Sequence, residues 1–282
     1  MSAVSTAELV LAARASGIGV AAFNVITLEH AEAIVSAAEQ TRLPVILQIS
    51  ENAVKFHGGR LEPLLAGAAA VARGAAVPVA LHLDHVEDEE LLRAGVAAGV
   101  SSVMFDASRL PYEENVRSTA RIAAWAHAAG VWVEAELGEV GGKDGAHAPG
   151  VRTDPAEAAA FTAATGVDTL AVAVGSSHAM TERTARLDLG LISRLRAAVN
   201  VPLVLHGSSG VPDEELRQAV TAGMVKINIG TALNIAFTGA VRDRLAADPA
   251  VVDPRRYLRP AREAMSATAA HLLRVVSGRA SV

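Results

Sequence analysis

The sequence contains no cysteine among its 282 residues. Disulfide bonds, thiolate catalysis and cysteine-ligated zinc sites are therefore excluded, which leaves His, Asp and Glu as the strong metal ligands. Aromatic residues make up only 3% of the chain, and this scarcity disfavours a surface that binds nucleic-acid bases or sugars by stacking. Any metal site must be built from the nine histidines and the carboxylates.

The sequence also lacks a basic stripe and a long apolar run. Its 25 basic and 30 acidic residues are interspersed and give a net charge of -5, so neither nucleic-acid binding nor polybasic membrane anchoring is expected. No apolar run reaches the roughly 18 residues of a membrane span, and residues 1–17 have no basic region followed by a long apolar one, as a secretory signal would. We therefore expect a cytoplasmic protein whose partner is a small molecule.

Short apolar runs alternate with segments of helical periodicity along the chain. The runs are apolar throughout rather than alternately apolar and polar, which indicates a parallel sheet covered on both faces. Eight such units in a chain of this length predict a TIM (β/α)8 barrel, an α/β fold, in a single domain over residues 1–282. The eight runs are 19–25, 44–50, 78–84, 102–106, 131–137, 169–175, 202–207 and 225–230.

A doubly wound open sheet is the alternative fold. Such a sheet usually carries a G-x-G-x-x-G turn after its first strand, and here the first run is followed by "ITLEHAEAIV". No linker rich in Pro, Gly or Ser divides the chain. The barrel is the simpler interpretation.

Histidines stand at the ends of three predicted strands, where barrel enzymes place their active sites. His85, His178 and His206 can supply three imidazole nitrogens to zinc and leave a fourth position open, as a catalytic zinc site does. They lie far apart in the sequence, so only the barrel can bring them together. Glu134 and Glu136 are two residues apart on one strand and project to the same side, where a nearby cation would stabilise them.

Three glycine-containing loops follow predicted strands. The long segment 138–155 can close over a substrate, although a plain surface loop is the alternative. Residues 206–211 and 228–233 follow the last two strands, where barrels commonly bind phosphate through backbone N–H groups and a helix N-terminus. These two loops predict a phosphorylated ligand.

The motifs resemble those of one enzyme family in order along nearly the whole chain. They are "AFNV", "PVILQIS", "HLDH", "SVMFDAS" with "LPYEEN", "VEAELGEVGG", "DTLAVAVGSSH", "PLVLHGSSGVPDEEL", "KINIGTAL" and "DPRRYL". With them the sequence resembles the class II, zinc-dependent fructose-bisphosphate and tagatose-bisphosphate aldolases. The resemblance implies a lyase that reversibly cleaves a ketose bisphosphate, such as fructose or tagatose 1,6-bisphosphate, to dihydroxyacetone phosphate and an aldehyde.

The resemblance also implies roles for individual residues. The three histidines would hold the catalytic zinc, and Asp84 would move a proton at the hydroxyl of the aldehyde half. Asp106 and Glu136 match positions that hold a second, displaced metal in some members, so a second divalent or a monovalent cation is a further candidate. The expected substrate and phosphate contacts are Asn24, Ser50, Ala179, Gly207, Ser208, Ser209, Asn228, Ile229, Gly230 and Thr231. A homo-oligomer, dimer or tetramer, is expected.

Two departures from the family pattern leave alternatives open. Where the family has a catalytic glutamate in the loop after "GG", this chain has Lys143 and Asp144, so the base is Asp144 or lies elsewhere. The residue after His178 is usually glycine and is Ala179 here, which leaves the sugar undecided. Open alternatives are an aldolase for another ketose phosphate, a zinc-dependent hydrolase that uses metal-bound water, and a non-catalytic sugar-phosphate binder.

A metal-free Schiff-base aldolase mechanism would need a reactive lysine. The chain has three lysines, Lys55, Lys143 and Lys226. The first two are expected in exposed loops, where an ammonium keeps its ordinary pKa and is a poor nucleophile. Lys226 lies two residues before Asn228, nearer the start of its strand, and we expect it to form an internal ion pair beneath the site.

Overall fold

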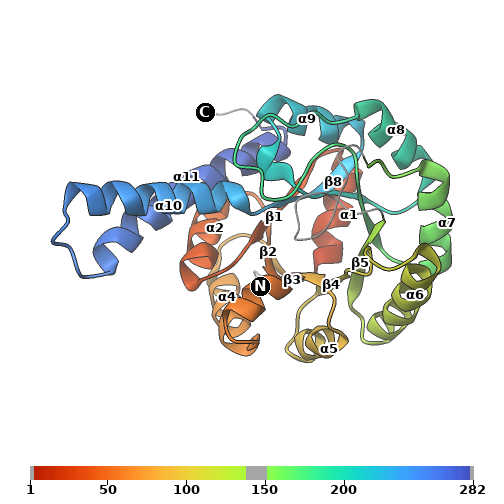
Figure 1. Cartoon of the computed structure of the whole chain (residues 1–282), viewed down its shortest axis with the longest axis horizontal. Helices are drawn as coiled ribbons and strands as arrows, with labels where there is room; N and C mark the ends of the chain where they lie inside the picture. Colours follow the sequence, from red (N-terminus) through yellow and green to blue (C-terminus); the bar gives the residue numbers. More distant parts are fainter. Residues whose placement is uncertain (1–2, 138–150, 280–282) are drawn as a thin grey trace.

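The computed structural model describes residues 3–137 and 151–279. In this part of the chain eight parallel strands close into a barrel in sequence order, surrounded by helices (Figure 1). The barrel closes where β1 pairs with β8, with Val20 opposite Lys226. The strands are β1 Val20–Asn24, β2 Val45–Ser50, β3 Val79–Val86, β4 Ser102–Phe105, β5 Trp132–Leu137, β6 Thr169–Val172, β7 Leu203–Leu205 and β8 Met224–Ile229.

The predicted TIM barrel is confirmed, and every predicted apolar run contains or overlaps one strand. The sixth strand ends earlier than its run suggests, at Val172. His178 therefore lies in a loop beyond β6 rather than at the strand end. The helices are α1 Thr6–Ser16, α2 Leu28–Thr41, α3 Glu51–Phe56, α4 Glu62–Gly74, α5 Glu89–Ala97, α6 Tyr112–Ala128, α7 Pro155–Thr165, α8 Leu189–Ala198, α9 Asp213–Ala222, α10 Thr231–Ala247 and α11 Arg255–Val276.

Local sequence signals explain where helix α7 begins. Asp154 accepts hydrogen bonds from the N–H groups of Ala156 and Glu157, and Pro155 occupies the first turn of α7, where its missing N–H costs nothing. No helix of the described residues is long and apolar enough to cross a membrane.

The interior of the barrel changes from apolar to polar along the strands. At the N-terminal end, Leu9 and Val10 of α1 pack against the inward-facing Val20, Ile46 and Ala80. Because residues two apart on a strand share a face, the positions further along the same strands also face inward. Those positions carry polar side chains: Asn24, Gln48, His82 and Asp84. Helix α1 therefore closes an apolar floor, and the polar groups gather at the C-terminal end.

Candidate active site and metal centre

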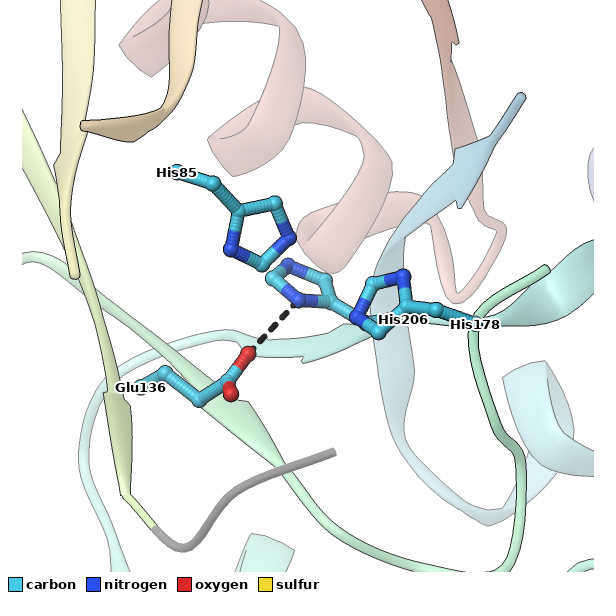
Figure 2. Close-up of side chains that lie close together, drawn as sticks. All are labelled: His85, Glu136, His178 and His206. Atoms are coloured by element: carbon cyan, nitrogen blue, oxygen red, sulfur yellow. Dashed lines mark hydrogen bonds and ion pairs between the residues drawn. The ribbon is translucent and has the colours of Figure 1, made fainter. Parts of the chain in front are cut away.

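The barrel brings together the three histidines that are distant in the sequence (Figure 2). Ring centroids lie 4.6 Å apart for His85 and His206, 5.1 Å for His85 and His178, and 5.6 Å for His178 and His206. His85 is near the end of β3 and His206 directly follows β7. The expected convergence of these side chains on one rim is therefore observed.

Glu136 of β5 joins the histidines as a fourth possible ligand. One donor atom from each of the four side chains lies within 4.8 Å of the others. Oε2 of Glu136 accepts a hydrogen bond from Nδ1 of His206 at 2.8 Å. Three imidazoles and a carboxylate are the donor types that zinc uses in proteins, so these residues fit a metal ion.

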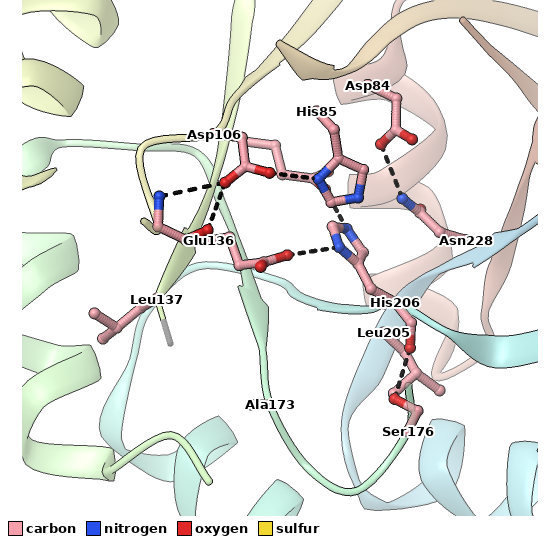
Figure 3. Close-up of polar contacts among 12 residues, drawn as sticks. Asp84, His85, Asp106, Glu136, Leu137, Ala173, Ser176, Leu205, His206 and Asn228 are labelled. Atoms are coloured by element: carbon pink, nitrogen blue, oxygen red, sulfur yellow. Dashed lines mark hydrogen bonds and ion pairs between the residues drawn. The ribbon is translucent and has the colours of Figure 1, made fainter. Parts of the chain in front are cut away.

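Asp106 stands beside this four-residue group and not within it (Figure 3). Its Oδ2 lies 2.7 Å from Nδ1 of His85, and its Oδ1 accepts from the hydroxyl of Ser108 at 2.6 Å. A carboxylate in this place orients the imidazole. Its part in a second cation site stays a prediction.

The charge around the histidines favours a bound cation. Four carboxylates, each at most 5% exposed, surround them, and buried carboxylates require compensating positive charge. Among the described residues the fully buried lysine of this region is Lys226. Burial alone would lower the pKa of His206, but hydrogen bonds to Glu134 and Glu136 raise it to about 9. The site thus attracts positive charge. The carboxylates belong to Asp84, Asp106, Glu134 and Glu136.

Backbone strain is concentrated here. Three non-glycine residues of the described chain have positive φ, and two of them are His85 at 49° and Ala179 at 57°. Such conformations cost energy for residues with a Cβ and cluster at functional sites. Both residues also line the cavity described below.

Asp84 presents a fixed carboxylate beside His85 (Figure 3). Side-chain amides donate to it from Asn228 at 3.2 Å, Gln48 at 3.3 Å and Asn24 at 3.5 Å. Burial would raise the pKa of Asp84, but electrostatic interactions with nearby basic side chains, His85 first among them, hold it below its usual range. An ionised, oriented carboxylate of this kind can accept a proton.

A layer of ion pairs lies beneath these groups. Nζ of Lys226 is 2.8 Å from Oε2 of Glu134 and donates to Oδ1 of Asn228 at 2.8 Å. The expected internal ion pair of Lys226 is therefore confirmed. His82 lies in the same layer with Nδ1 2.7 Å from the hydroxyl of Ser102, and burial lowers its pKa to about 3, so it is neutral.

A cavity of about 710 Å³ opens above the histidines, a size suited to a small ligand. Four expected site residues, His206, Asp106, Glu136 and Ile229, are buried and do not line it, and Asp144 lies outside the described residues. The expected site residues that line it are Asn24, Ser50, Asp84, His85, His178, Ala179, Gly207, Ser208, Ser209, Asn228, Gly230 and Thr231.

The two expected phosphate loops form one wall of this cavity. Gly207 has φ of 67°, and a Cβ at this position would lie 2.5 Å from the carbonyl of Ser177, so only glycine fits without a shift. The hydroxyl of Ser209 accepts from the N–H of Ala232 at 3.0 Å and ties this loop to the first turn of α10. The N-terminus of α10 thus faces the cavity, where its partial positive charge favours an anion.

Gln48 is a site residue that the sequence interpretation missed. Its amide donates both to Asp84 and to Asn24, the latter at 2.8 Å. A signal was present, because Gln48 is a polar residue inside an apolar strand and lies two positions before Ser50, on the same face. Arg109, in the loop after β4, also lines the cavity, and no sequence pattern indicated it.

Known proteins resemble this chain over nearly its whole length. The family model described as "Fructose-bisphosphate aldolase class-II" matches residues 4–280. The fructose-bisphosphate aldolase of Geobacillus stearothermophilus is 43% identical over 271 residues, 95% of this chain and 94% of that protein. That of Thermus caldophilus is 40% identical over 289 residues, 93% of this chain and 94% of the relative. The crystal structure of the YdjI aldolase from Escherichia coli K12 superposes with a TM-score of 0.83 at 32% identity and covers 97% of each chain. The chain therefore belongs to the class II fructose-bisphosphate aldolase family.

Proposed function

We propose that this protein is a metal-dependent aldolase that reversibly cleaves fructose 1,6-bisphosphate to dihydroxyacetone phosphate and a phosphorylated aldehyde. The observation that carries the proposal is the cluster of three histidines beside the ionised Asp84, next to a cavity that also borders two phosphate-type loops. The relatives named fructose-bisphosphate aldolase support this choice of substrate.

We assign zinc as the metal, with His85, His178 and His206 as its ligands. Nitrogen ligands of this kind suit zinc and leave a position for substrate. When bound, zinc acts as a Lewis acid that polarises the ketose carbonyl. Asp106 and Glu136 remain the candidates for a second cation.

Asp84 serves as the proton acceptor in cleavage. It takes the proton from the hydroxyl on the carbon that becomes the aldehyde. The O–H electron pair forms the new C=O bond as the carbon–carbon bond breaks, and the electron pair of that bond stays on the dihydroxyacetone phosphate half. The amides of Asn228, Gln48 and Asn24 keep the carboxylate in place while this happens. We propose Asp144 as the residue that protonates the dihydroxyacetone phosphate half.

The loops after β7 and β8 bind a phosphate of the substrate in this proposal. Gly207 and Gly230 allow a close approach of the backbone, and Thr231 begins α10 at the cavity wall. Asn24 of β1, the strand that pairs with β8, lies next to Gly230, and Ser50 ends the following strand β2; in this proposal both contact the sugar. Ser50 has a second task, because its hydroxyl accepts from the N–H of Ala53 and caps α3.

The test is a cleavage assay on protein stripped of metal with a chelator and then reloaded. Release of dihydroxyacetone phosphate from fructose 1,6-bisphosphate should vanish with the metal and return with zinc. Tagatose 1,6-bisphosphate and other ketose phosphates, tested in parallel, identify the preferred sugar. Full activity of metal-free protein would contradict the assignment, and release of inorganic phosphate without an aldehyde would favour a hydrolase.

We also propose a homo-oligomer. Figure 1 shows α10 and the start of α11 extending beyond the barrel, and Leu233 is the buried residue of α10. Helix α10 and the loop after it expose apolar side chains, with Ile235 at 47% and Val252 at 89%. Such exposure favours association with a second copy. Light scattering at several protein concentrations tests this proposal. A cytoplasmic location stays a prediction from the sequence.

A further inference from the structure

Lys226 is a lysine that the barrel buries completely, with 0% of its side chain exposed. Burying an ammonium is costly unless it is paired and hydrogen-bonded, and lysine is almost never fully buried without a partner. The chain has only two other lysines, Lys55 and Lys143, so a lysine-rich composition does not explain it. The groups that bind the Lys226 ammonium therefore indicate what this lysine does.

Each partner of the ammonium makes a second contact toward the cavity. Nζ lies 2.8 Å from Oε2 of Glu134 and 2.8 Å from Oδ1 of Asn228. The other oxygen of Glu134 lies 3.0 Å from Nε2 of His206, and Nδ2 of Asn228 donates to Asp84 at 3.2 Å. One ammonium thus begins two hydrogen-bonded branches, which end at a proposed metal ligand and at the proposed proton acceptor.

These branches cross the inside of the barrel. In the strand order β6 and β7 separate β5 from β8, and β1 and β2 separate β3 from β8. The side-chain contacts therefore do not reinforce strands that already pair through their backbones. They fix the relative positions of side chains on strands that are not neighbours.

We propose that Lys226 is a positioning residue that aligns His206 and Asp84 with one another, an inference that rests on the proposed aldolase function. Along the first branch, Glu134 holds Nε2 of His206, so that the ring directs Nδ1 toward Glu136 and the metal-binding group.

The second branch fixes the orientation of an amide. A lysine ammonium can only donate hydrogen bonds, so it selects the oxygen of Asn228 and not its nitrogen. The NH₂ group of Asn228 must then face Asp84, where it donates to the carboxylate. Without the ammonium the Asn228 amide is free to rotate by about 180°. Its oxygen would then face the Asp84 carboxylate, and the two oxygens would repel each other.

The experiment compares Lys226→Met, which keeps much of the side-chain volume but removes the charge, with Glu134→Gln, which alters only the branch to His206. Zinc affinity is measured by competition with a chromophoric chelator, and kcat and KM are measured at saturating zinc.

Loss of an outer partner of a metal ligand weakens metal binding by about 10- to 100-fold. We expect that loss in both variants. We expect kcat to fall about tenfold or more in Lys226→Met alone, through misplacement of a group that transfers a proton, with KM changed by less than about threefold.

The matched control is Arg217→Met, which removes an exposed cation of α9 and should change neither zinc affinity nor kcat. A folded Lys226→Met protein with a lower Tm but unaltered zinc affinity and kcat would reduce Lys226 to a structural role and overturn the proposal. If Lys226→Met does not fold, Glu134→Gln decides, because unchanged zinc affinity in that variant also overturns it. Zinc affinity needs no turnover, so absence of aldolase activity in the parent protein would reject the proposed function separately.

Discussion

Replacement of Asp84 by asparagine removes the proposed proton acceptor with little change of shape. The two carboxylate oxygens divide the donors: Oδ1 accepts from Asn228, and Oδ2 accepts from Gln48 and Asn24. The new NH₂ group would face some of these donors. Gln48 can accommodate it by turning its amide, because its buried Oε1 has no hydrogen-bond partner among the described residues.

The expected cost to folding is therefore small and the expected cost to catalysis is large. We expect the free energy of unfolding to change by about 1 kcal/mol, as for one altered hydrogen bond. Removal of a positioned general base typically slows the chemical step by about 10²- to 10⁴-fold. This corresponds to an activation free energy higher by about 3 to 5 kcal/mol, since each tenfold is worth about 1.4 kcal/mol. Zinc content should not change, because Asp84 is not among the four grouped donors.

The assay separates the two halves of the reaction. Cleavage of fructose 1,6-bisphosphate is followed through dihydroxyacetone phosphate, and exchange of a dihydroxyacetone phosphate proton in deuterated water is followed by NMR. Asp84→Asn should slow cleavage at least a hundredfold and leave exchange nearly normal. The control is Asp168→Asn, since Asp168 binds the backbone N–H of Val133 and His127 and does not line the cavity. A cleavage rate within about threefold of the parent, at full zinc content, would refute the role of Asp84.

Four further predictions follow from the site. His206→Ala should lose both bound zinc and activity, as measured by metal analysis and the cleavage assay; a fully active, zinc-free variant would show that the cluster is not a metal centre. Asp144→Asn should slow proton exchange at near-normal zinc content, and normal exchange would move the base to another residue. Borohydride added with dihydroxyacetone phosphate should neither inactivate the protein nor add substrate mass, because the Lys226 side chain is fully buried and engaged by Glu134; a covalent adduct at Lys226 in the mass spectrum would contradict the metal mechanism. Gly207→Ala should lower stability by about 1–2 kcal/mol from its left-handed backbone alone, and further because the new Cβ would approach Ser177 to 2.5 Å; an unchanged Tm would contradict this.

The fold could be predicted because its signals are local. Each strand is a short, mostly apolar run, as expected for a strand covered by helices on one side and packed inside the barrel on the other. The convergence of His85, His178 and His206 then follows from closure of the barrel. The exact positions of individual site residues depend on long-range packing, which no local sequence pattern indicates. The loop that places His178 is held by packing of Ser177 against Gly207 and by the positive φ of Ala179.

Asp106 is a residue whose position the sequence predicts but whose role it leaves open. A carboxylate at the end of β4 can bind a cation directly or orient a histidine that does. In the structure its Oδ2 lies 2.7 Å from His85 while Ser108 occupies the other oxygen. A difference of a few ångströms decides between the two roles, and that difference arises from the packing of β3 against β4.

Glu134 and Glu136 show how depth in the barrel separates the roles of equivalent residues. Their spacing predicts that both project to the same side of the strand, and both indeed contact the same imidazole, at Nε2 and Nδ1 of His206. Two residues of strand place them about 6–7 Å apart along β5. Glu134 lies at the depth of the Lys226 ammonium and is neutralised by it, whereas Glu136 lies among the metal-binding donors. The lysine, placed two residues before Asn228 just as Glu134 is placed two before Glu136, therefore neutralises the lower carboxylate and leaves the upper one in the group of possible metal ligands.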